Sequence, residues 1–260
     1  MSKVLNLPAK NNANVGQSSA ERRCSVFAYH QLSGGTVLLA LMAGLTLTSA
    51  KTVSAELYLS SGFSFTQYDV LGEVYIPVSL RASSDRGSIG ISSGWIGLEN
   101  SPGAIDDTAV SARLYDLLSS DYCQCGLDVQ GSVKIPTATL DMGTGEFDLQ
   151  YGATLYRYSS SGTVYLSYDY RINGDSLTTA YPDYSIWSAG GIAHLNDTTA
   201  LGVFYDLQED EIPDSGARTI TIFLGLAASD RLSIRPFFSN TKERPEGGSN
   251  TLGLYFDVTL

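Results

Sequence analysis

The stretch TLGLYFDVTL, residues 251–260, decides the fold. Its side chains alternate strictly between an apolar face and a face of mixed polarity. The apolar face holds Leu252, Leu254, Phe256, Val258 and Leu260, and the other face holds Gly253, Tyr255, Asp257 and Thr259. A period of two residues is the period of a β-strand, whose successive side chains point to opposite sides of the sheet. The stretch therefore predicts a strand with one apolar and one polar face.

This last strand resembles the signal by which bacterial outer-membrane barrels are assembled. The resemblance rests on Phe256, Val258 and Leu260. Such signals usually end in an aromatic residue, whereas the last residue here is Leu260. We therefore expect Phe256 to supply the aromatic contact instead. The resemblance implies the barrel-assembly machinery as a partner.

The same alternation recurs upstream. It is found in residues 74–82, 122–135, 147–155, 164–172, 201–208, 220–226 and 232–238. In these stretches aliphatic and aromatic residues share one face while charged and polar residues share the other. This is the pattern of a membrane barrel with a wet interior.

Turn lengths separate a barrel from a soluble sandwich. Short turns at 83–86, 119–121, 159–162, 196–198 and 229–230 alternate with longer loops at 99–107, 136–145, 173–183, 208–216 and 242–249. Tight turns at one end and long loops at the other are typical of outer-membrane barrels. We predict an all-β fold, a single antiparallel up-and-down transmembrane β-barrel of about twelve strands. Ten strands remain an alternative, because residues 108–118 and 184–194 alternate poorly, and a soluble exported β-sandwich remains a second one.

Composition agrees with a membrane barrel. Charged residues make up 17% of the 260 residues, below the value of about 25% usual in soluble proteins. No stretch after residue 50 is long and apolar enough to span a bilayer as a helix. The formal net charge of −11 argues against nucleic acid as a partner. The expected partners are outer-membrane lipid and a small-molecule solute of unknown identity.

The N-terminal region has the order of a secretory signal. Arg22 and Arg23 precede the apolar stretch TVLLALMAGLTLTSA, residues 36–50, and small residues follow it. We expect residues 1–55 to be a leader and residues 56–260 to form the barrel in the bacterial outer membrane.

Charged residues on the polar faces are candidates for lining the lumen. They are Glu73, Arg81, Arg113, Asp128, Lys134, Asp148, Asp169, Arg171, Asp206, Arg235 and Asp257. One interpretation is that they pair across strands and fill the barrel. The other is that they form a charged lining that tunes the passage of a solute.

The sequence offers no catalytic constellation. Barrel proteases and phospholipases need a His beside an acid or a Ser, and only His30 and His194 occur. His30 lies in the expected leader and His194 beside a short turn. We therefore expect neither an enzyme nor a cofactor, and no metal site, since the acidic stretch QEDEIPD (residues 208–214) lacks the spacing of a calcium loop.

Two further sets of residues are expected to face the lipid. Cys123 and Cys125 would lie on the same side of one strand, about 6.5–7 Å apart, and remain free thiols. Four tyrosines are expected in the aromatic girdles at the membrane interfaces, namely Tyr151, Tyr168, Tyr170 and Tyr205.

The most specific stretch is SVKIPTATLDMGTGEFDLQYGATLYR, residues 132–157. Its K-I-P-T turn at residues 134–137, the G-T-G at 143–145 and the acidic Asp148 resemble a strand–loop–strand motif of the outer-membrane transporter family named after the meta-pathway of phenol degradation. The tyrosine-rich YLSYDYRINGD, residues 165–175, is similar to another strand of that family. The resemblance covers about 45 residues in motif.

The resemblance implies a channel or transporter for small, hydrophobic or aromatic molecules. Residue Ala138 follows Thr137 where the family often has a longer loop. The alternatives are a structural or adhesive barrel with a plugged lumen and the soluble β-sandwich.

Overall fold

The structure is a computed structural model, and it describes residues 55–68, 71–99, 102–139, 145–174, 181–212, 215–244 and 247–260. The expected leader lies outside these residues, except for Ala55. The described part of the chain folds into β-strands. They are β1 (Glu56–Tyr68), β2 (Gly72–Ser84), β3 (Gly87–Leu98), β4 (Ala104–Ile105), β5 (Thr108–Ser120), β6 (Cys125–Ile135), β7 (Asp148–Ser159), β8 (Gly162–Ile172), β9 (Tyr184–Asn196), β10 (Thr199–Asp210), β11 (Gly216–Ala227), β12 (Leu232–Arg244) and β13 (Gly248–Thr259).

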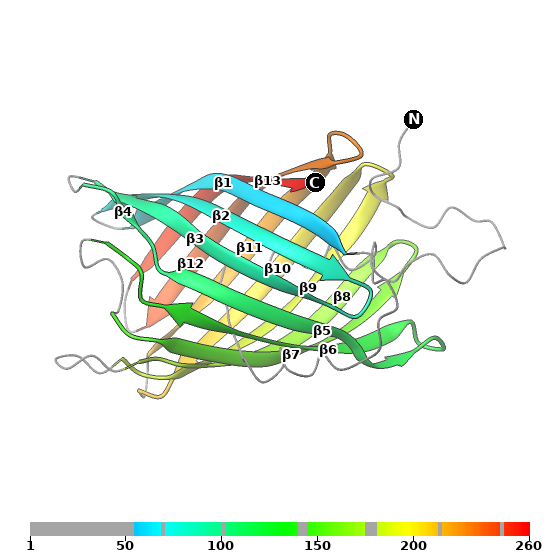
Figure 1. Cartoon of the computed structure of the whole chain (residues 1–260), viewed down its shortest axis with the longest axis horizontal. Coiled ribbons are helices and arrows are strands. Elements are labelled where there is room, and N and C mark those ends of the chain that lie inside the picture. The colour runs from blue at the N-terminus through cyan, green and yellow to red at the C-terminus, as the bar shows by residue number, and fades with distance from the viewer. Residues whose placement is uncertain are drawn as a thin grey trace.

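The strands form one closed antiparallel barrel (Figure 1). Each long strand pairs with its neighbours in the chain, and β1 closes the barrel by pairing with β13 from Tyr58↔Thr259 to Tyr68↔Ser249. Twelve of the strands are long, while β4 has only two residues and pairs with β3 alone. The prediction of a twelve-strand up-and-down barrel is confirmed. The ten-strand and β-sandwich alternatives are wrong.

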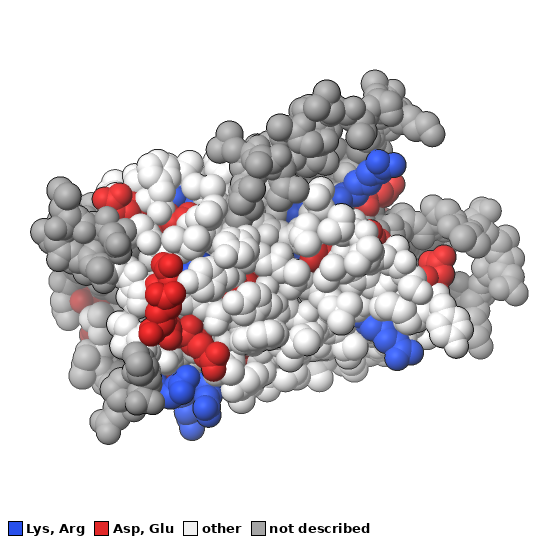
Figure 2. Space-filling model, turned by 90° about the horizontal axis from the view of Figure 1, so that it is seen from below, with Lys and Arg blue, Asp and Glu red and all other residues white. Residues whose placement is uncertain are grey.

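The outer face of the barrel is apolar. Large hydrophobic side chains on every second position stay exposed, among them Phe63, Val78 and Ile220 at about half exposure. In Figure 2 the charged residues of the face in view gather mainly toward the two ends and leave a band of uncharged residues between them. A closed barrel has no unpaired sheet edge, so an apolar outer band is the surface it needs in lipid. No helix among the described residues is long and apolar enough to cross a membrane.

The two ends of the barrel differ in their connections. The end that carries Glu56 and Leu260, called the terminal end below, has short turns between β2 and β3, β5 and β6, β7 and β8, β9 and β10, and β11 and β12. The opposite end, called the loop end, has longer connections between β3 and β5, β6 and β7, β8 and β9, and β10 and β11, and short ones between β1 and β2 and between β12 and β13. The loop predicted over residues 242–249 is wrong, because β12 runs to Arg244 and β13 starts at Gly248. The other long loops lie at this end as the sequence predicted.

Aromatic residues gather on the outer face toward the loop end. Tyr151, Tyr168 and Tyr205 are exposed there, and the Tyr168 ring lies 4.7 Å from Trp187. Tyr170 donates a hydrogen bond to Glu211 in the connection between β10 and β11. These positions are those expected of an interfacial girdle.

A β-bulge joins β4 to β5. Opposite β3, Ser92 pairs with Ala109 and Trp95 pairs with Ile105, so the β4–β5 side holds one residue more than β3 over this span. An extra residue in a strand breaks the alternation of side chains and can re-aim one of them. This segment was predicted to be a loop, residues 99–107. The bulge instead continues the barrel wall.

The region around the two cysteines corrects the sequence prediction. Residues 121–124 form a turn, so the strand predicted over 122–135 begins at Cys125. Gln124 has a left-handed φ of 51°, and the Cα atoms of Cys123 and Cys125 lie 5.2 Å apart and carry a disulfide. The distance expected for two positions of an extended strand does not apply across a turn. The prediction of free thiols is wrong.

A second irregularity explains the poor alternation of residues 108–118. The β5–β6 register shifts between Leu114 and Leu118, and Asp116 within this span has a φ of 50°. The backbone N–H of Asp116 donates to the carboxylate of Asp128 at 2.8 Å instead of joining the ladder. A bulge therefore hides the strand period from a sequence pattern.

Candidate functional site

One side of the barrel interior is filled by aromatic rings, which we call the aromatic wall. It consists of Tyr156, Tyr165, Phe204, Phe223, Phe237 and Tyr255, together with Ile192 and Ala200. Phe204 is fully buried, with its ring centroid 5.3 Å from Phe223 and 5.2 Å from Tyr165. The Phe237 and Tyr255 rings stack at 5.1 Å. Rings at these separations pack a barrel interior as they pack a protein core.

Glycines make room for these rings. Phe204 lies opposite Gly190 in the β9–β10 register, and Phe223 lies opposite Gly202 in the β10–β11 register. A Cβ atom on either glycine would overlap the facing ring. The aromatic wall therefore depends on glycine at these inward positions.

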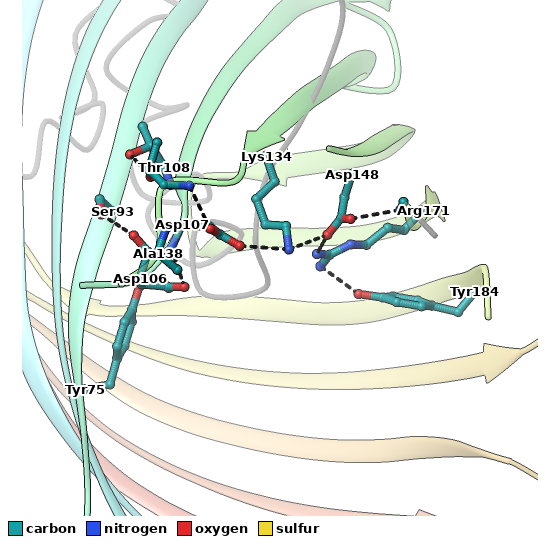
Figure 3. A network of polar contacts seen from close by, with 12 residues as sticks. Tyr75, Ser93, Asp106, Asp107, Thr108, Lys134, Ala138, Asp148, Arg171 and Tyr184 are labelled. Atoms are coloured by element: carbon teal, nitrogen blue, oxygen red, sulfur yellow. Dashed lines mark hydrogen bonds and ion pairs between the residues drawn. The ribbon is translucent and has the colours of Figure 1, made fainter. Parts of the chain in front are cut away.

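An ionic ladder crosses the interior near the loop end (Figure 3). The ammonium of Lys134 lies 3.1 Å from Asp107 and 2.7 Å from Asp148. The guanidinium of Arg171 binds Asp148 as well and donates to the Tyr184 hydroxyl at 2.9 Å. The ladder thus runs from the β4–β5 bulge through β6, β7 and β8 to β9. Asp107 and Asp148 are almost fully buried, and each is held by a cation, as a buried carboxylate requires.

The K-I-P-T turn singled out in the sequence holds this ladder. Its Lys134 binds Asp107, and the backbone N–H groups of Thr137 and Ala138 donate to the same Asp107 carboxylate, each at 2.9 Å. The acidic Asp148 of the same motif is the other partner of Lys134. Lys134 of the motif therefore bridges Asp148 and Asp107, and the β-bulge turns Asp107 inward.

The other predicted charges form smaller groups on the inward face. Arg113 pairs with Asp128 at 3.2 Å, both nearly fully buried, and Arg235 pairs with Asp257. Asp169 accepts a hydrogen bond from Gln130, while the Arg81 guanidinium lies 4.8 Å from the centre of the Tyr58 ring at the terminal end. Asp206 is half-buried and lies opposite Ser188 in the β9–β10 register.

A cavity of about 300 Å³ lies in the interior. Its walls come from β1, β2, β3, the β4–β5 bulge, β5 to β8, β12 and β13, and none of its lining residues comes from β9, β10 or β11. The acidic lining residues are Glu73, Asp106, Asp107, Asp148 and Asp257, and the basic ones are Lys134, Arg171 and Arg235. The cavity therefore lies beside the ionic ladder, and the strands at the centre of the aromatic wall contribute nothing to it.

Six of the predicted lumen-lining residues contribute to this cavity, namely Glu73, Lys134, Asp148, Arg171, Arg235 and Asp257. Arg81, Arg113, Asp128, Asp169 and Asp206 lie elsewhere on the inward face. Whether any of them contacts a solute stays a prediction.

Sequence reasoning missed several residues of the cavity. Asp106 and Asp107 were assigned to a loop, because a bulge leaves no mark in the sequence pattern. Tyr75 lies on the inward face of β2, and the alternation of side chains along that strand could have predicted its position. Among the described residues no group of His, Cys, Asp and Glu is arranged to hold a metal ion.

Comparisons with known proteins connect this fold to the outer membrane. No family model matches the sequence, and no curated protein matches it. Among solved structures, an outer-membrane channel from Pseudomonas putida F1 superposes with a TM-score of 0.64 at 11% identity, over 82% of this chain and 97% of that one.

Two further solved structures are of proteins described by their solutes. The KdgM porin in complex with oligogalacturonate superposes with a TM-score of 0.53 at 10% identity, over 75% of this chain and 97% of that one. The CymD monoaromatic hydrocarbon channel superposes with a TM-score of 0.50 at 9% identity, over 87% of this chain and 94% of that one. At such low identity the likeness is one of fold. Together with the closed ladder and the apolar outer band of this chain, it shows the fold of a transmembrane β-barrel.

Proposed function

We propose that this barrel is an outer-membrane channel for small molecules, with the loop end outside the cell and the terminal end in the periplasm. The observation that carries the proposal is the cavity of about 300 Å³ inside the barrel, lined by polar and charged side chains beside the ionic ladder. A cavity of this size suits a small solute. The fold it shares with solved outer-membrane channels supports passage rather than a reaction.

The finer assignment to the phenol meta-pathway transporter family rests on the motif around Lys134 and Asp148. The family's hydrophobic or aromatic solutes come to this chain only through that likeness. The hydrocarbon channel among the structural neighbours supports an apolar solute, whereas the oligogalacturonate porin supports a polar one. The fold alone therefore leaves the solute class open.

Reconstitution tests the proposal. The purified barrel, its folding verified by heat-sensitive migration in gels, should produce discrete conductance steps in a planar lipid bilayer. Liposomes that contain it should swell in solutions of small uncharged solutes. A folded, inserted barrel that gives neither conductance nor swelling would rule out the channel.

The second candidate is a structural or adhesive barrel with a plugged lumen. It is favoured by the aromatic wall, in which Phe204 is fully buried, and by the ion pairs of Arg113 and Arg235. The same bilayer measurement separates the two functions, because a plugged barrel inserts without conducting.

We also propose that the C-terminal strand is read by the barrel-assembly machinery through Phe256, Val258 and Leu260. The support is that β13 closes the barrel against β1, with the Leu260 N–H donating to the Leu57 carbonyl at 2.9 Å. Replacement of Phe256 by Ala should lower the amount of folded barrel in the outer membrane. An unchanged amount would count against this partner.

A further inference from the structure

The connections at the loop end are acidic without exception. The six of them contain no Lys and no Arg, and their carboxylates are Asp69, Glu99, Asp106, Asp107, Asp141, Glu146, Asp175, Asp183, Glu211, Asp214 and Glu246. The turns at the terminal end hold both signs, with Arg86 and Arg231 among their residues. The strand ends beside these connections add the cations Arg218, Lys242 and Arg244, so the loop end carries both signs with an excess of carboxylates. Such an excess attracts cations and repels anions.

The cavity also has excess negative charge. Each of its three cations, Lys134, Arg171 and Arg235, is engaged by a carboxylate. Among the described residues Glu73 and Asp106 form no ion pair. The Asp106 carboxylate accepts a hydrogen bond from the Tyr75 hydroxyl at 3.3 Å. The lining therefore holds five carboxylates and three cations.

A buried hydroxyl in the same wall points to a ligand independently. Tyr255 is 9% exposed and belongs to the cavity lining, and no described residue forms a hydrogen bond with its hydroxyl. Buried polar groups are nearly always hydrogen-bonded in the native state. A phenol oxygen can accept a hydrogen bond from an ammonium group, so a bound cation would satisfy it.

The rest of the lining fits an ammonium ion with a small apolar body. Tyr75 offers an aromatic ring, and Pro77 and Ile96 offer aliphatic surface. Cations are attracted to aromatic faces as well as to carboxylates, and the ring and aliphatic groups among the charged residues give an organic cation contacts that a hydrated metal ion cannot use. An anion would meet the carboxylates of Glu73 and Asp106.

We propose that the cavity binds small organic ammonium ions through Glu73, Asp106 and Tyr255, and that this site makes the barrel cation-selective. The inference rests on the proposed channel function and names its class of solute. The acidic connections of the loop end supply the attraction and the cavity supplies the binding site.

The first test is a reversal potential in planar bilayers with a KCl gradient. The native barrel prefers K⁺ over Cl⁻, and the double variant Glu73→Gln, Asp106→Asn lowers the permeability ratio by at least about threefold. The matched control Asp197→Asn makes the same chemical change in an exposed turn at the terminal end and leaves the ratio unchanged. Propylammonium, which keeps three N–H donors on a small apolar body, added at the loop end should reduce the K⁺ current of the native barrel and of Asp197→Asn, but much less that of the double variant.

The outcomes distinguish a failure of the proposed ammonium site from a failure of the proposed channel function. A folded barrel without conductance overturns the channel itself, and the inference with it. A conducting barrel that prefers Cl⁻, or whose preference survives in the double variant, overturns the inference alone. Conductance that propylammonium does not reduce overturns the ammonium site.

Discussion

The aromatic wall and the ionic ladder fill the same barrel interior by different means. Phe204, Phe223 and Tyr165 occupy one side with rings that pack against one another. Lys134, Asp148 and their partners on the other side are held by directional contacts and lie along a cavity of about 300 Å³. The difference teaches that packed rings fill volume, whereas hydrogen-bonded charges fix geometry without filling it.

Truncating the centre of the aromatic wall should have the largest effect on stability. Phe204→Ala removes a fully buried ring and should lower the free energy of unfolding by about 3–5 kcal/mol. Denaturant unfolding of the refolded barrel measures this loss. The control Phe204→Leu keeps most of the volume and should cost less than about 1.5 kcal/mol. Equal, small losses for both variants would show that the rings do not pack as a core.

Crowding the same wall should have a smaller effect. Gly190→Ala places a methyl group where the Phe204 ring lies, and overpacking of this kind costs about 1–3 kcal/mol. Gly225→Ala is the matched control, because a Cβ there meets neighbouring atoms only at ordinary contact distance. If both substitutions lower the free energy of unfolding by the same amount, the close fit between Gly190 and Phe204 does not contribute to stability.

Breaking the ionic ladder, which lies near the loop end, should lower the free energy of unfolding modestly. Asp148→Asn removes the charge that binds Lys134 and Arg171, and we expect a loss of about 1–3 kcal/mol. Lys134 keeps Asp107 as a partner, which limits the loss. Asp197→Asn, in an exposed turn, should change stability by less than about 0.5 kcal/mol. An equal loss of unfolding free energy in Asp148→Asn and Asp197→Asn would show that the ionic ladder does not stabilise the barrel.

The disulfide should contribute least. It joins Cys123 to Cys125 across a turn and closes a very short loop, so the model of unfolded-chain entropy assigns it about 1–2 kcal/mol. Comparison of unfolding with and without reductant measures this contribution, with Cys123→Ser as the control that should not respond to reductant. A response in that variant would show that the reductant acts elsewhere.

Period-two patterning predicted most of the fold. Together with the positions of the turns it gave the number of long strands, and by itself it gave the phase that places Lys134, Asp148 and Arg171 on one face. These features are local, because each strand shows its own two faces and each connection its own length. The aromatic wall was only partly visible, because its rings occupy inward positions that the pattern reserves for polar residues.

Other parts of the site could not be read from the sequence. An extra residue before β5 turns Asp106 and Asp107 inward, and the left-handed Gln124 brings two cysteines together. Both depend on single backbone conformations that the period of the neighbouring strands does not encode. The two unpaired carboxylates of the cavity likewise emerge only once the register shows which charges meet.

The most direct test of this account compares chemical access to its two sides. In a barrel whose three cysteines are replaced by Ser, Ser92→Cys places a thiol in the cavity wall and Ser188→Cys places one at a position that is 1% exposed. A cationic methanethiosulfonate reagent should modify the first rapidly and reduce its conductance, and should leave the second almost unmodified. Equal modification of both thiols, or modification of Ser92→Cys without any change in conductance, would contradict the account.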